Sequence, residues 1–182
     1  MTATDPKDPR IEGQTLFCPG EGPAHLKCSN TQGNNYQWYK RKMTAPDPEP
    51  IEGEYGTEIT LDLYNATTNF YSVRFDYEGK SYMTPEVQID QRAFAGLTVS
   101  ARGNFSGSGG TFIIKDGGYV IFTIGSPYDT NIIWYKDEMP IKGETKTQLK
   151  VTTAGRYGVE AAPQVCPNYS ARLGSALIVV KE

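Results

Sequence analysis

The chain has 182 residues, which is enough for one or two domains, and 38% of them are hydrophobic. Its net charge of −3, from 18 basic and 21 acidic side chains, argues against a nucleic-acid-binding protein, which needs a basic face. The single histidine, His25, has no acid–base cluster near it in the sequence, so we expect no enzyme, no catalytic residue and no cofactor.

The apolar runs are too short for a membrane helix. The longest, residues 119–124 and 176–180, fall well below the roughly 20 residues that cross a bilayer. Residues 1–6 are polar and show no signal-peptide core. We therefore expect neither a signal peptide nor a membrane-inserted segment in this stretch of chain.

Alternation of apolar and polar residues predicts short, half-buried strands along the whole chain. In chain order, they cover residues 24–28, 59–63, 71–75, 87–89, 120–124, 149–151 and 177–179. Turn residues such as Pro19-Gly20 and Asp116-Gly117 separate them, and no apolar stripe of helical period is sustained. The predicted fold class is all-β.

An internal duplication divides the chain. Residues 35–40 recur as residues 131–136, so the two tryptophans, Trp38 and Trp134, lie 96 positions apart (134 − 38). Four further blocks recur in the same order: 24–28 with 120–124, 51–54 with 141–144, 69–73 with 155–159, and 86–89 with 176–179. The chain is therefore two copies of one module.

Each copy has the pattern of an immunoglobulin-like sandwich. A tryptophan in the third strand, ten positions after an inward-facing residue of the second, is the core position of that fold. Tyr71 and Tyr157 stand two positions before Val73 and Val159, as in a tyrosine corner. We predict two tandem immunoglobulin-like antiparallel β-sandwiches, residues 10–91 and 94–182. Their predicted core includes Trp38, Trp134, Tyr71 and Tyr157.

The cysteines lack the spacing of a metal site, and we expect no bound metal. Cys18 and Cys28 are ten positions apart, and the turn residues 19–23 would bring the strand before them beside the strand after them. This arrangement favours a Cys18–Cys28 disulfide with Cys166 unpaired. The competing interpretation is a buried free thiol at Cys28, because the alignment with Ile124 turns Cys28 inward.

A family resemblance rests on four motifs. They are Phe17-Cys18-Pro19-Gly20-Glu21, the Trp-Tyr-Lys strand, Ala154-Gly155-Arg156-Tyr157 and Cys166-Pro167-Asn168-Tyr169-Ser170. In this order they resemble the tandem immunoglobulin-like repeats of secreted and surface proteins in Bacteroidetes-type bacteria. Such repeats often carry both an early and a late cysteine, whereas here the first copy keeps only the early one and the second only the late one. The resemblance implies an extracellular protein used for adhesion or as a spacer.

The first copy carries the candidate partner-binding residues. The interval from Trp38 to Tyr71 is ten residues longer than that from Trp134 to Tyr157 (33 against 23), and we place the excess in residues 43–55. Alternate prolines there preorder the chain, and exposed tyrosines suit sugars or proteins. The candidates are Tyr55, Pro46, Pro48, Glu52, Tyr77 and Tyr82. The alternative interpretations are that the loop is a solvated spacer and that the tyrosines form cross-strand pairs. The acidic residues of the loop could bind calcium, but alternate prolines spread them apart, so a solvated acidic loop is favoured.

These features favour a non-catalytic adhesion or spacer module of a larger bacterial cell-surface or secreted protein. The expected partners are a protein or glycan on a cell or matrix surface and neighbouring domains of the same parent chain. A carbohydrate-binding module attached to a secreted hydrolase is the main alternative. Three N-x-S/T triplets, at residues 65–67, 104–106 and 168–170, keep a eukaryotic receptor ectodomain as a minor one.

Overall fold

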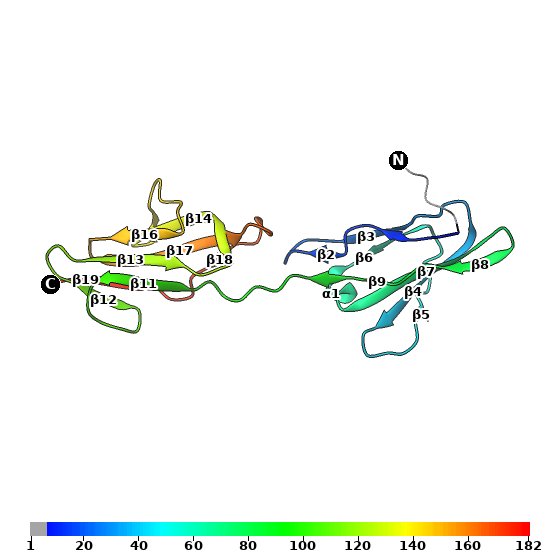
Figure 1. Ribbon diagram of the computed structural model, residues 1–182, viewed down its shortest axis with the longest axis horizontal. Coiled ribbons are helices and arrows are strands. Elements are labelled where there is room, and N and C mark those ends of the chain that lie inside the picture. Colours follow the sequence, from blue (N-terminus) through cyan, green and yellow to red (C-terminus); the bar gives the residue numbers. More distant parts are fainter. Residues whose placement is uncertain (1–6) are drawn as a thin grey trace. The chain divides into compact units, whose positions relative to one another are not determined.

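The computed structural model describes residues 7–182, and strands dominate it (Figure 1). The chain divides into two compact units, Met1–Ala93 and Phe94–Glu182. The predicted all-β fold class is confirmed, since the longest helix of the described part has four residues. Residues 1–6, on which the signal-peptide expectation partly depends, lie outside the described residues. No helix within residues 7–182 is long and apolar enough to span a membrane.

The first unit contains two main sheets. The smaller has the order β1 (Ile11–Glu12), β3 (Ala24–Cys28) and β6 (Glu58–Leu61). The larger has the order β5 (Glu49–Pro50), β4 (Asn34–Lys42), β7 (Asn69–Tyr77) and β8 (Lys80–Met83), with β9 (Val87–Gln88) also pairing with β7. A short parallel pair joins β2 (Leu16–Phe17) to β10 (Asp90–Gln91), and α1 (Leu63–Ala66) connects β6 to β7.

The second unit repeats this plan. Its smaller sheet has the order β11 (Val99–Asn104), β13 (Tyr119–Ile124) and β16 (Gln148–Val151). Its larger sheet has the order β12 (Thr111–Ile114), β19 (Leu177–Lys181), β17 (Gly155–Pro163), β14 (Tyr128–Lys136) and β15 (Met139–Pro140), and β18 (Ala171–Arg172) pairs with β17. Strand β12 runs parallel to β19, so the chain leaves the smaller sheet after β11 and joins the larger one.

The two tryptophans occupy equivalent core positions. Both side chains are 0% exposed. The indole Nε1 of Trp38 donates a hydrogen bond to the carbonyl of Gly56 (2.9 Å), and that of Trp134 donates one to the carbonyl of Lys146 (2.8 Å). Each indole is thus buried with its one polar group satisfied, which removes the main cost of burying tryptophan.

Both units contain a tyrosine corner. The Tyr157 hydroxyl donates to the carbonyl of Thr153 at 3.0 Å, and the Tyr71 hydroxyl donates to the carbonyl of Ala66 at a longer 3.4 Å. The acceptor in the first unit belongs to α1, which replaces the plain turn found in the second unit.

The excess residues of the first unit lie in two places, not in one. Tyr39 is eleven positions from its cross-strand partner Pro50 (50 − 39), whereas Tyr135 is five from Pro140 (140 − 135). The β4–β5 hairpin therefore holds six of the ten extra residues. The other four lie between β6 and β7, where residues 62–68 form α1 and its flanks and the second unit has only residues 152–154. Placing all ten in residues 43–55 was wrong.

The predicted cysteine pairing is also wrong. Cys28 is a free, buried thiol, whereas Cys18 and Cys166 are both disulfide-bonded. The alternation of β3 explains this state, because it points Ala24, Leu26 and Cys28 into the core. The Cys28 thiol points between the two sheets, so Cys18, on the loop after β2, cannot reach it. The competing interpretation, a buried free thiol at Cys28, is therefore the right one.

Candidate functional site

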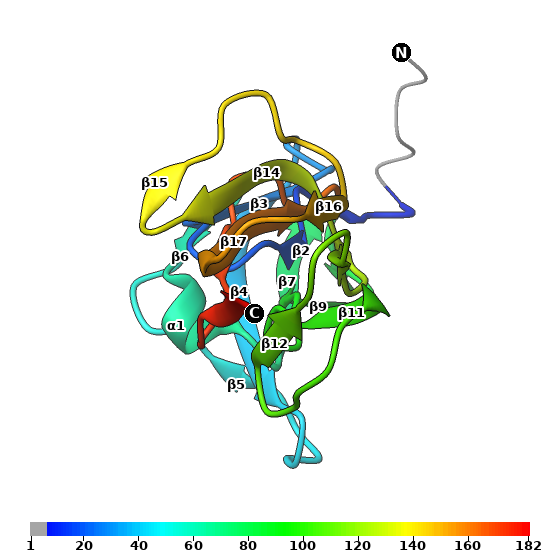
Figure 2. The ribbon, with the colours of Figure 1, turned by 90° about the vertical axis from the view of Figure 1, so that its left-hand side faces the viewer.

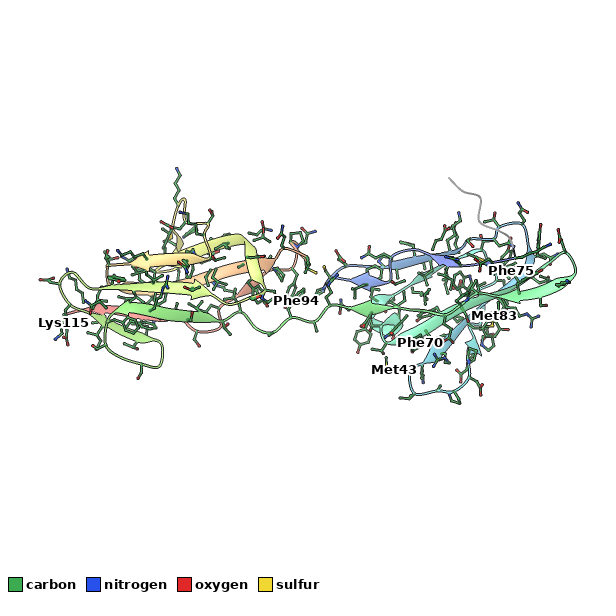
Figure 3. The ribbon with its side chains drawn as sticks, in the orientation of Figure 1. Met43, Phe70, Phe75, Met83, Phe94 and Lys115 are labelled. Carbon is green, nitrogen blue, oxygen red and sulfur yellow. The ribbon has the colours of Figure 1, made fainter. Side chains whose placement is uncertain are left out.

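The β4–β5 connection is a long, mostly exposed loop of the first unit. We call residues 43–48 the hairpin loop. In Figure 2 it extends downward from β4 and β5, beyond the paired strands. Met43, labelled in Figure 3, is 56% exposed, Pro46 is exposed, and Pro48 is half-buried. The loop therefore offers apolar and acidic side chains to solvent on a backbone that proline restricts.

Arg41 anchors this loop. Its Nε and Nη2 atoms donate to the carboxylate of Glu86 at 2.9 and 2.6 Å, and its Nη1 donates to the carbonyl of Ala45 at 3.2 Å. The guanidinium also lies 4.3 Å from the ring centroid of Phe70. The hydrogen bonds from Arg41 lower the pKa of Glu86. A bidentate ion pair stacked on an aromatic ring holds the loop base in one geometry.

Tyr55 and Glu52 lie on the next segment, residues 51–57, which crosses from β5 to β6. Tyr55 is 62% exposed, and Glu52 is exposed at the turn. The backbone beneath them is fixed, since the amide of Ile51 donates to the carbonyl of Trp38 at 2.8 Å. Both side chains are available to a partner.

Tyr77 and Tyr82 are less exposed than the sequence prediction assumed. Both are half-buried and pack against the core of the first unit. The ring of Tyr82 stacks on Phe75 (5.8 Å between centroids), and Phe75 stacks on Tyr36 (5.5 Å). The premise of an outward-facing Tyr77 fails because β7 alternates with Tyr71, Val73 and Phe75 inward, and Tyr77 follows the same phase.

The six candidates do not form one surface. Strands β4 and β7 are antiparallel, with Lys42 opposite Asn69 at one end and Asn34 opposite Asp76 at the other. The hairpin loop follows the first end. Tyr77 and the β7–β8 turn follow the second. The sequence prediction therefore combined residues of the hairpin loop with residues near the β7–β8 turn, which lie at opposite ends of the β4–β7 pair.

A polar depression of about 470 Å³ occupies the second end, and we call it the tip depression. Its lining comprises Gln32, Asn34, Asp76, Tyr77, Glu78, Gly79 and Ser81. The Asp76 carboxylate accepts hydrogen bonds from the Ser81 hydroxyl (2.5 Å) and the Asn35 amide (2.9 Å), which lower its pKa. Sequence reasoning named only Tyr77 of this set, although glycine marks turns at residues 32–34 and 78–79.

His25 lies on the outward face of β3. Its Nδ1 is 3.0 Å from the Thr60 hydroxyl, and the ring is exposed. Across residues 7–182, no three His, Cys, Asp or Glu side chains gather closely enough to hold a metal ion. The acidic residues of the hairpin loop and the following crossover therefore do not gather into such a group.

The comparisons with known proteins bear on the fold. No protein-family model and no curated protein sequence matches the chain. Among solved structures, it is similar to the three N-terminal domains of the bacteriophage RB49 Highly Immunogenic Outer Capsid protein (Hoc), with a TM-score of 0.52 and 14% identity over 95% of this chain and 59% of that one. Both units are immunoglobulin-like β-sandwiches.

Two N-terminal four-Ig-domain structures of Dscam1 are more distant. Isoform 9.44 has a TM-score of 0.38 and 14% identity, covering 97% of this chain and 46% of that one. Isoform 7.44 has a TM-score of 0.35 and 13% identity, covering 92% and 42%. The chain spans less than two thirds of each of these three structures.

Proposed function

We propose that the chain is a non-catalytic adhesion or spacer module of a larger protein displayed on an outer surface. The observation that carries the proposal is the duplicated sandwich. The extra residues of the first unit form exposed connections between strands, and they do not enclose a chemical site. The likeness to Hoc adds support, because Hoc is by name an outer capsid protein.

The disulfide-bonded state of Cys18 and Cys166 supports an extracellular location, since such bonds persist mainly in oxidising compartments. The sequence resemblance to Bacteroidetes-type repeats favours a bacterial cell-surface or secreted parent. Its partners would be neighbouring domains of that parent and a protein or glycan on a cell or matrix surface.

Surface labelling tests the proposal. Antibodies raised against the purified chain should label intact source cells or particles, and mild external proteolysis should remove the label. Signal that appears only after lysis would contradict display. Beads coated with the chain then separate the two roles: binding to cells or matrix indicates adhesion, and its absence indicates spacing.

A second candidate function is saccharide binding at the tip depression, in a module attached to a secreted hydrolase. The depression combines the Tyr77 ring with the Asp76 carboxylate and the Gln32 amide. An aromatic ring suits the apolar face of a sugar, and the polar groups suit its hydroxyls. Glycan arrays should then show binding that Gln32→Ala or Ser81→Ala weakens and that the control Gln148→Ala, an exposed glutamine of the second unit, leaves intact. A silent array would remove this candidate.

A further inference from the structure

One segment has the same backbone in both units. Residues 49–60 and 139–150 each leave the larger sheet, cross to the smaller one and end in its edge strand, β6 or β16. Gly53 and Gly143 share a left-handed φ of 84° and 86°. The amide-to-carbonyl bond from Glu54 to Ile51 (3.2 Å) matches that from Glu144 to Ile141 (3.3 Å). We call these segments the first and second crossover edges.

The two crossover edges carry opposite charge. The first has four acidic residues and no basic one: Glu49, Glu52, Glu54 and Glu58. The second has three basic residues and one acidic one: Lys142, Lys146, Lys150 and Glu144. Net charge is thus −4 on one and +2 on the other, so most of the contrast between the two halves, −6 for residues 1–91 and +3 for residues 92–182, is located here.

Six of these eight charged residues are exposed, and Glu54 and Glu144 are half-buried. Glu52, Lys142 and Lys146 are exposed and have no ion-pair partner among residues 7–182, whereas Glu58 pairs with Lys27 at 3.2 Å. In Figure 2 the second crossover edge, drawn in yellow, arches away from β15 before it reaches β16. Another molecule can therefore approach these side chains.

Charge on sheet edges usually prevents strands from pairing with copies of themselves. Two first edges repel each other, as do two second edges, but a first edge attracts a second. We infer that this chain self-associates, with the first crossover edge of one copy binding the second crossover edge of another. Charge complementarity identifies the partner as a second copy of the chain. The contact joins two different surfaces and is therefore heterologous.

Sedimentation of the purified 182-residue chain at low and high ionic strength tests the inference. Self-association should appear at about 20 mM NaCl. It should weaken about tenfold or more at about 500 mM NaCl, because dissolved ions then screen the attraction between charges that are more than a few ångströms apart. The variant Glu49→Lys with Glu52→Lys and Glu58→Lys changes the first edge from −4 to +2 and should lose association. The variant Lys142→Glu with Lys146→Glu and Lys150→Glu changes the second edge from +2 to −4 and should lose association as well. A chain carrying all six changes keeps the net charge of −3 and should associate again, because the two edges have exchanged their charges.

A matched control lies on the opposite edge of each small sheet. Glu12→Lys in β1 faces the same Lys27 that Glu58 faces, and Arg102→Glu in β11 lies across Ile121 from Lys150. These changes should leave association unaltered. The inference is overturned by a monomer at low salt, by association insensitive to salt, by control variants as weak as the edge variants, or by failure of the sixfold variant to recover. Circular dichroism confirms that each variant is folded.

Discussion

At the scale of single residues, the two tryptophans carry the cores. Replacing Trp38 or Trp134 with alanine empties a fully buried site and leaves a carbonyl without its indole donor. We expect each change to lower the free energy of unfolding by about 3–5 kcal/mol, which is a large part of the total for a small domain. Urea denaturation of the full chain measures this loss. Tyr64→Ala, at a site 91% exposed, is the control, and an equally small effect of either tryptophan variant would contradict the packing.

Cys28 gives a second test at this scale. The side chain of Cys28 is 0% exposed, and the other two cysteines are disulfide-bonded. A thiol-specific reagent should therefore label none of the cysteines in the unreduced native protein. After unfolding without reductant, one thiol per chain should react. Cys28→Val, which suits the apolar site, should abolish that signal. Three reactive thiols in the unfolded, unreduced protein would contradict the assignment.

Burial also makes stability depend on alkaline pH. Desolvation raises the pKa of Cys28 and of the tyrosines Tyr36, Tyr71 and Tyr128 in the folded state. A group whose pKa is raised in the folded state contributes its full share to folding stability below its unfolded-state pKa. This contribution is lost as the pH rises from the unfolded-state pKa through the folded-state pKa. We expect the urea midpoint to fall above about pH 8.5 for the thiol and more steeply above about pH 10 for the phenols. Cys28→Val should delay the onset, and a flat profile up to pH 11 (roughly one unit above a free phenol) would contradict this reasoning.

At the scale of elements, sequence alternation located seven of the strands, each to within two residues at either end, because burial of one sheet face imposes a period of two. It placed β3 and β13 with their inward residues, and the duplicated blocks aligned Trp38 with Trp134. The division of the ten extra residues was not readable in the same way. A length difference gives only a total, and the four-residue α1 is too short to show a helical period.

The hairpin loop offers a test of this element-scale picture. Its residues contribute no buried apolar side chain, and the equivalent turn in the second unit is only Asp137-Glu138, both with positive φ. Replacing residues 41–48, which are the last two residues of β4 and the hairpin loop, with Asn-Gly, which favours that turn, should leave a folded protein with only a modestly lower urea midpoint. The change removes the Arg41–Glu86 ion pair, whose side chains are 20% and 31% exposed. Loss of cooperative unfolding would show that the loop supports the sandwich.

At the scale of the whole molecule, the sequence predicted two similar units and the stronger irregularity of the first. It did not separate the hairpin loop from the tip depression, because only the register of β4 and β7 assigns them to opposite ends of a sheet. The sequence also contains the opposite charges of its two halves, −6 and +3, but not the place in the fold where they gather. That place required the edge strands β6 and β16, which pairing alone identifies.

If the chain binds an outside partner, we expect the first unit to make the contact, through the exposed hairpin loop and Tyr55. Proline-restricted backbone and a rigid aromatic side chain both reduce the entropy lost on association. In the bead assay, the Asn-Gly replacement and Tyr55→Ser should each reduce binding, by about tenfold for a loss near 1.4 kcal/mol. Thr145→Ala changes the aligned position of the second unit and should leave binding intact, as should Gln148→Ala. Equal losses from both units, or a loss confined to the second, would move the binding surface away from the hairpin loop, since none of the altered residues belongs to a buried core.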